Sequence, residues 1–148
     1  MKRYFDCIFA DDIRTEMGGK HSIIGIHNHV LALNAPPAMI PKMAVSLNCF
    51  TDFDHPFKQI AIKVLLDDTV IVQNELPPEF LEQSFNENRK LLEDAGVDLS
   101  SQMYRVTANI HLNPFVIKQD GKVSVFITAD GKETLAGSLF LRIPKNPR

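Results

Sequence analysis

Hydrophobic and polar residues alternate with a period of two along much of this chain, which is the pattern of β-strands with one buried face. The clearest example is residues 42–51, and residues 57–66 and 102–112 repeat the alternation. In the first segment the apolar positions are Met43, Val45, Leu47 and Cys49. Each segment therefore predicts a strand with one face in the core and the other toward solvent.

Turn residues divide the rest of the chain into further predicted strands. Gly18 and Gly19 separate a strand at 4–15 from one at 20–33, and Asp67 and Asp68 separate the strand at 57–66 from one at 69–75. Strands are also expected at 114–118, 122–128 and 133–143, with tight turns at Asp120-Gly121 and Asp130-Gly131. The strands from 42 to 75 are predicted to form a meander.

Two proline-containing segments interrupt the strands. Residues 34–41 hold three prolines, which lack the N–H donor, so we expect an extended crossover without ladder hydrogen bonds. After Pro77-Pro78, Leu81, Phe85 and Leu92 recur at helical spacing up to Gly96, which predicts one amphipathic helix over about 78–95. Residues 144–148 are expected to fray.

These elements predict a mainly β fold. We expect an antiparallel β-sandwich, Ig-like or C2-like, of about eight strands with one inserted helix, because hairpins predominate over crossovers. The length of 148 residues predicts a single domain over 1–148.

The charge and the cysteine content indicate which partners and which cellular location to expect. The formal net charge is -2 and the charges of both signs are scattered, so we expect no nucleic-acid partner and no membrane association. Cys7 and Cys49, the two cysteines, lie in apolar alternating segments and are expected to be reduced, buried thiols, able to pair only if their strands are neighbours. Two reduced cysteines without a disulfide framework predict a cytoplasmic protein.

His27 and His29 are the sharpest candidates for chemistry. Residues two apart in a strand point the same way, so both imidazoles could reach one divalent metal ion. Ile23, Leu31 and Leu33 have the same parity, however, and the structural interpretation, in which the histidines lie at the polar edge of an apolar face, is preferred. His21, His55 and His111 are possible additional ligands.

Acidic residues form a second candidate. Asp11-Asp12 and a possible acidic loop cluster of Asp52, Asp54, Asp67 and Asp68 offer the oxygen ligands that Ca²⁺ favours, provided that the loops converge. A turn-forming role of these aspartates is preferred. Five phenylalanines could form an exposed apolar patch, although core positions are favoured: Phe50, Phe53, Phe57, Phe80 and Phe85.

Residues 9–26 carry a resemblance to a known family. An Asp precedes Ile13-Arg14, and Glu16, Gly19-Lys20 and Ile24-Gly25-Ile26 follow. This run is similar to the opening of a family of small, uncharacterised bacterial and phage-associated β-rich proteins, and the prolines at 36, 37 and 41 with the strand at 42–51 look like the same arrangement. The resemblance covers the first third of the chain well and the rest loosely, and it implies no activity, cofactor or site residue.

The preferred function is a non-enzymatic module that binds an unknown protein partner or assembles with itself, using sheet edges, the helix or loops at one end. No nucleophile elbow or phosphate-binding loop is present in the sequence, so an enzyme is not favoured and no catalytic residue or cofactor is assigned. Two alternatives stay open. One is a metal-dependent enzyme or metal-binding protein using His27 and His29, and the other is carbohydrate or small-ligand binding on a sheet face.

Overall fold

The computed structural model describes residues 1–145, and strands make up 57% of them, so the protein is mainly β as expected. The described residues contain eleven strands rather than about eight. They are β1 (Arg3–Thr15), β2 (His21–His27), β3 (Val30–Ala32), β4 (Ala38–Ile40), β5 (Met43–Asp52), β6 (Ile60–Leu66), β7 (Thr69–Glu75), β8 (Met103–Leu112), β9 (Phe115–Ile117), β10 (Gly121–Ala129) and β11 (Lys132–Arg142). The expectation for the tail falls partly on residues 146–148, which lie outside the described residues.

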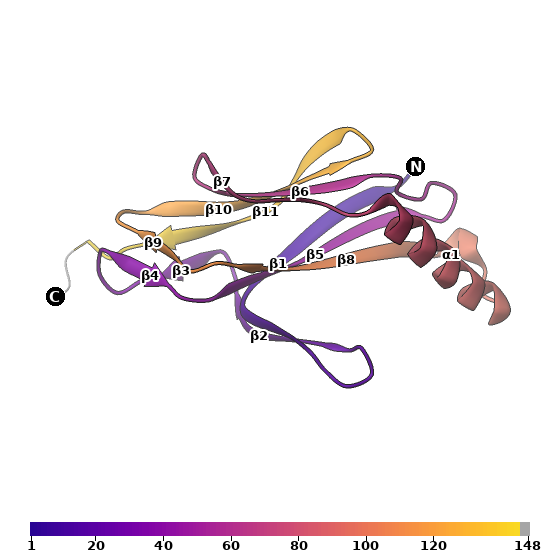
Figure 1. Cartoon of the computed structure of the whole chain (residues 1–148), viewed down its shortest axis with the longest axis horizontal. Helices are drawn as coiled ribbons and strands as arrows, with labels where there is room; N and C mark the ends of the chain where they lie inside the picture. Colours follow the sequence, from indigo (N-terminus) through magenta and orange to yellow (C-terminus); the bar gives the residue numbers. More distant parts are fainter. Residues whose placement is uncertain (146–148) are drawn as a thin grey trace.

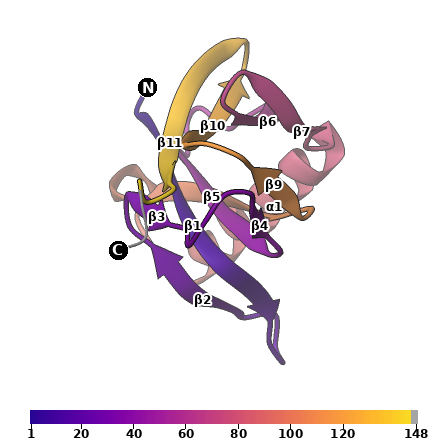
Figure 2. The same ribbon diagram turned by 90° about the vertical axis from the view of Figure 1, so that its left-hand side faces the viewer.

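The strands form three open sheets. The first has the order β2-β1-β5-β8, the second has the order β3-β11-β10-β6-β7, and the third pairs β4 with β9. All pairs are antiparallel except β3 with β11, which is parallel. The two larger sheets lie one over the other, as Figure 1 shows from the side and Figure 2 from one end.

The core lies between the two larger sheets because alternate residues of their strands point inward. In the first sheet Leu47 is opposite Cys7 and Val45 is opposite Phe9, so these apolar side chains share one face. In the second sheet Val125 pairs with Val64 and Ile127 with Ile62 in the same way. All of these side chains belong to a single buried cluster or pack against it.

The predicted helix is confirmed as α1 (Pro78–Asp94), followed by a short 3₁₀ turn, η1 (Leu99–Ser101). Leu81 and Phe85 are its buried residues, as the spacing predicts. The ring of Phe85 meets the ring of Tyr104 edge to face at 5.2 Å, and the Tyr104 hydroxyl donates a hydrogen bond to the Ser84 hydroxyl at 2.8 Å. The helix is thereby fixed beside β8 at one end of the molecule (Figure 1).

Two predictions about strand boundaries are wrong. The strand expected at 20–33 is divided, because the chain leaves the first sheet after His27 and joins the second sheet at Val30. The proline crossover at 34–41 was expected to lack ladder hydrogen bonds, yet its residues Ala38–Ile40 form β4, whose partner is β9. Ladder pairing is possible there because the prolines flank β4 rather than interrupt it.

The predicted meander is also only partly present. β6 and β7 form the expected hairpin, but β5 and β6 belong to different sheets, so residues 53–59 cross from one layer to the other. The turn at Asp130-Gly131 is confirmed, with φ of 48° and 86° joining β10 to β11. Asp120-Gly121 makes no hairpin, since β9 pairs with β4 and not with β10.

Candidate functional site

The structure places His27 and His29 in different surroundings. His27 ends β2, and its Nε2 atom is buried and lies 3.0 Å from Oδ1 of Asp11, without the geometry of a hydrogen bond. His29 lies in the two-residue step between β2 and β3, where its backbone oxygen accepts a hydrogen bond from the Phe140 N–H at 2.9 Å. The two histidines therefore do not occupy one continuous strand, which was the premise of the predicted metal pair.

The remaining histidines are dispersed. His21 begins β2, His55 follows β5 with its Nδ1 2.5 Å from Asp52, and His111 on β8 lies 4.0 Å from Asp12. In residues 1–145 no group of three or more His, Cys, Asp or Glu side chains is arranged to hold a metal ion.

The four aspartates of the possible acidic loop cluster do not converge. Asp52 and Asp54 lie near the start of β6, whereas Asp67 and Asp68 follow its end, and a seven-residue strand spans roughly 20 Å. The Asp52 carboxylate accepts hydrogen bonds from the N–H groups of Lys2 and Asp54. Because of the Lys2 N–H first, and of His55 second, the pKa of Asp52 is lowered to about 2.

Asp67 lies in the turn between β6 and β7 and bonds to β10. Its carboxylate accepts a hydrogen bond from the Lys122 N–H at 3.0 Å, and its backbone φ is 51°. The bond from the Asp54 N–H to Asp52 is the local pattern of a turn-forming aspartate, whereas the bonds of Asp52 with Lys2 and of Asp67 with Lys122 join segments far apart in the chain.

Cys7 and Cys49 lie on neighbouring strands, β1 and β5, and both are free thiols. Cys7 is opposite Leu47 and Cys49 is opposite Phe5, so the two are diagonal neighbours rather than a direct pair. Burial, with the nearby Asp6 carboxylate acting in the same direction, raises the pKa of each thiol to about 12. Neither thiol is activated for nucleophilic chemistry.

The phenylalanines are divided between core and surface. Phe53, Phe57 and Phe85 are buried, whereas Phe80 on the helix is 47% exposed. The Phe50 ring stacks on Tyr4 with centroids 4.3 Å apart. These positions do not form one exposed aromatic patch.

A cleft that the sequence did not predict opens between the two large sheets. β2 pairs with β1 only from Phe9 onward, and β3 pairs with β11 only at its last residues, 140–142. The first half of β1 and most of β11 thus each have a strand on one side only. These two free edges lie near each other, and at one point Cys7 packs against Gly137.

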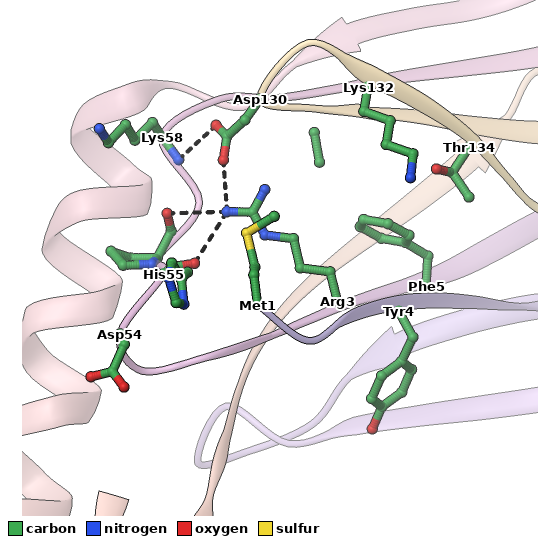
Figure 3. A pocket seen from close by; sticks show the side chains of 12 residues that line it. Met1, Arg3, Tyr4, Phe5, Asp54, His55, Lys58, Asp130, Lys132 and Thr134 are labelled. Atoms are coloured by element: carbon green, nitrogen blue, oxygen red, sulfur yellow. Dashed lines mark hydrogen bonds and ion pairs between the residues drawn. The ribbon is translucent and has the colours of Figure 1, made fainter. Parts of the chain in front are cut away.

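The cleft is a cavity of about 850 Å³ near the start of β1 and the β10–β11 turn. Arg3 and Phe5 line it from β1, Lys132 and Thr134 line it from β11, and the loop at 54–58 forms a third wall (Figure 3). A register shift between Val125 and Phe126 leaves Ala136 as an extra residue in β11. Such a bulge bends a strand.

Arg3 holds the base of the cleft together. Its Nη2 atom lies 2.8 Å from Oδ2 of Asp130 and 3.1 Å from the backbone oxygen of His55, and its guanidinium lies 4.6 Å from the centre of the Phe57 ring. Oδ1 of Asp130 accepts hydrogen bonds from the N–H groups of Lys58 and Gln59. Arg3 and Asp130 therefore join both sheets and the loop between them.

Lys132 is a cation in this part of the cleft whose charge has no compensating partner among the described residues. It is exposed, it has no ion-pair partner in residues 1–145, and Figure 3 shows its side chain extending toward Phe5 and Thr134. The same view shows the side chains of Lys58 and Asp54 directed away from this region. The cavity combines the apolar side chains of Met1, Tyr4 and Phe5 with several charged and polar ones, among them Arg3, Asp130 and Lys132.

The fold and the cleft define a mainly β protein with a cavity near the edges of two open sheets. The model of the Family of unknown function (DUF6941) matches residues 6–142, so the chain belongs to this family. The match extends far beyond the first third of the chain and includes helix α1. No curated protein matches the chain.

The described residues contain no helix with the length and apolar character needed to span a bilayer.

Proposed function

We propose that this protein is a non-enzymatic binding module that takes an extended segment of a partner protein along the free edge of β1, beside the cleft. The observation that supports the proposal is that residues 3–8 are paired on the β5 side only, next to the cavity of about 850 Å³. A strand with one unpaired side is a template for another strand. The added strand would place alternate side chains in the cavity.

Other outer edges of the described sheets are less suited to such pairing. β2 is interrupted by Gly25, whose φ is 69°, and β7 carries a register shift opposite Val64 and Leu65. β8 lies beside helix α1. Interruptions, bulges and covering elements are the usual means by which proteins protect sheet edges. The first half of β1 has no interruption or bulge, but β11 lies beside it at Cys7, so the open part of this edge is the part at residues 3–5 that lines the cavity.

Display of random peptides, selected against the purified chain, tests the proposal. Selected peptides are expected to bind with micromolar or better affinity and to shift the backbone amide NMR signals of residues 3–8. Failure to select any peptide, or shifts confined to β2 or β8, would contradict it. Light scattering provides the second arm: a dimer whose free form already protects the amides of residues 3–8 from hydrogen exchange would mean that the edge is used for self-association instead.

The other sequence-based hypotheses stay predictions. They are a metal site at His27 and His29, carbohydrate or small-ligand binding on a sheet face, cytoplasmic location, oligomer formation and a bacterial or phage-associated origin. The assignment of the two large layers to an Ig-like or C2-like sandwich also stays a prediction. Elemental analysis of protein purified without a histidine tag or chelator tests the metal hypothesis, and stoichiometric zinc, iron or manganese would support it.

A further inference from the structure

We propose that the bound segment presents an acidic side chain to Arg3 and Lys132. This inference rests on the proposed function, because it names the chemistry of the segment that the cleft accepts. It would make the cleft selective for partners that carry Asp or Glu within an extended stretch.

The first argument is the charge balance of the cleft. Asp130, the carboxylate nearest to Arg3, has both oxygens occupied, one by Arg3 and the other by two backbone N–H groups. It therefore compensates Arg3 and leaves the charge of Lys132 without a partner in the described residues. A carboxylate is the complementary group for an ammonium.

The second argument is the fixed position of Arg3. The side chain is only 14% exposed, and its Nε and Nη2 atoms donate to Thr51, His55 and Asp130. No hydrogen bond within residues 1–145 uses the Nη1 atom, and this atom is not among the buried unsatisfied groups of the described chain. A guanidinium held in this way offers its remaining donors without a further loss of side-chain freedom.

The third argument concerns the shape of the site. In Figure 3 the Lys132 side chain ends near Phe5 and Thr134, so a group bound to Lys132 meets an aromatic ring and a hydroxyl as well as positive charge. The CH₂ groups of an Asp or Glu side chain suit the ring, and its oxygens suit the donors.

Charge reversal on both partners tests the inference. For a peptide selected by display, Lys132→Glu is expected to weaken binding by about tenfold or more, and replacing the acidic residue of the peptide by Lys should restore binding to this variant. Lys132→Met removes the charge while keeping a long side chain and should give a smaller loss. Lys20→Glu, an equal charge change at an exposed position in the β1–β2 connection, is the matched control and should bind normally.

The outcomes separate the two proposals. Selected peptides that lack an enriched Asp or Glu, or that bind Lys132→Glu as well as the unaltered chain, would overturn the inference and leave the proposed function intact. Loss of binding when the peptide C-terminus is amidated would show that a terminal carboxylate is the occupant and would also overturn it. Absence of any selected peptide would overturn the proposed function itself.

Discussion

The contact between Gly137 and Cys7 allows a quantitative test of how closely the two sheets approach. A Cβ atom added at Gly137 would lie 2.5 Å from the Cys7 Sγ atom, more than about 1 Å inside an ordinary non-bonded contact. Its next neighbour, a ring carbon of Phe9, is 3.8 Å away and needs no adjustment. Overpacking of this kind destabilises the fold by about 1–3 kcal/mol. Replacing Gly by Ala at an ordinary φ stabilises it by about 0.4–1 kcal/mol, because the unfolded chain has less conformational entropy. Gly137→Ala is therefore expected to lower the free energy of unfolding by about 1–2 kcal/mol.

Urea denaturation of Gly137→Ala, Cys7→Ala and the double variant measures the effect and assigns its cause. Cys7→Ala removes the Sγ atom, so in that background Gly137→Ala should be neutral or slightly stabilising. The coupling between the two sites should then be about 1 kcal/mol or more. An equal loss of stability in both backgrounds would refute the reasoning, because the Sγ contact would not be the source of the cost.

Three further predictions concern other groups. The pKa of Asp52 is about 2 in the folded protein, below its ordinary value of 3.8, so Asp52 stabilises the fold above about pH 4 and this contribution is lost as the pH falls toward 2. Asp52→Asn should have a lower urea midpoint than the unaltered chain near neutral pH, and the two midpoints should converge near pH 2. With pKa values of about 12, Cys7 and Cys49 should react with a thiol reagent at pH 8 roughly a hundredfold more slowly than after unfolding in urea, and equal rates would contradict their burial. Phe85→Ala should lower the free energy of unfolding by about 3 kcal/mol, as urea denaturation would show, and a loss below about 1 kcal/mol would mean that α1 is not anchored by this ring.

Much of the fold was predictable because its long strands and helix carry strong periodic signals. The alternation in residues 42–51 and the helical spacing of Leu81 and Phe85 led directly to β5 (Met43–Asp52) and α1. The change of sheet after His27 was not predictable in the same way. His27, Leu31 and Leu33 have the same parity and are all partly buried. The alternation in the sequence therefore does not mark the point at which the chain stops pairing with β1 and begins to pair with β11.

The cleft was harder to predict because it depends on which strands are neighbours. Arg3 and Lys132 lie far apart in sequence and form no motif, and only the packing of β1 near β11 brings them to one cavity. One signal was available in the sequence. Arg3 has the parity of Phe5, Cys7 and Phe9, so it is a charge on the core-facing side of a strand, and such a residue requires a partner that the fold must supply.

The order in which the chain visits the two large sheets has a consequence for how the protein can be divided. Strands β1 and β2 belong to the first sheet, β3 to the second, β5 to the first, β6 and β7 to the second, β8 to the first, and β10 and β11 to the second. The layers are therefore interleaved in sequence. A cut between β7 and α1 would leave the amino-terminal fragment with β5 lacking its neighbour β8 and β6 lacking its neighbour β10. Split-protein reporters and truncated fragments made at such a point should regain structure only when both pieces are present together.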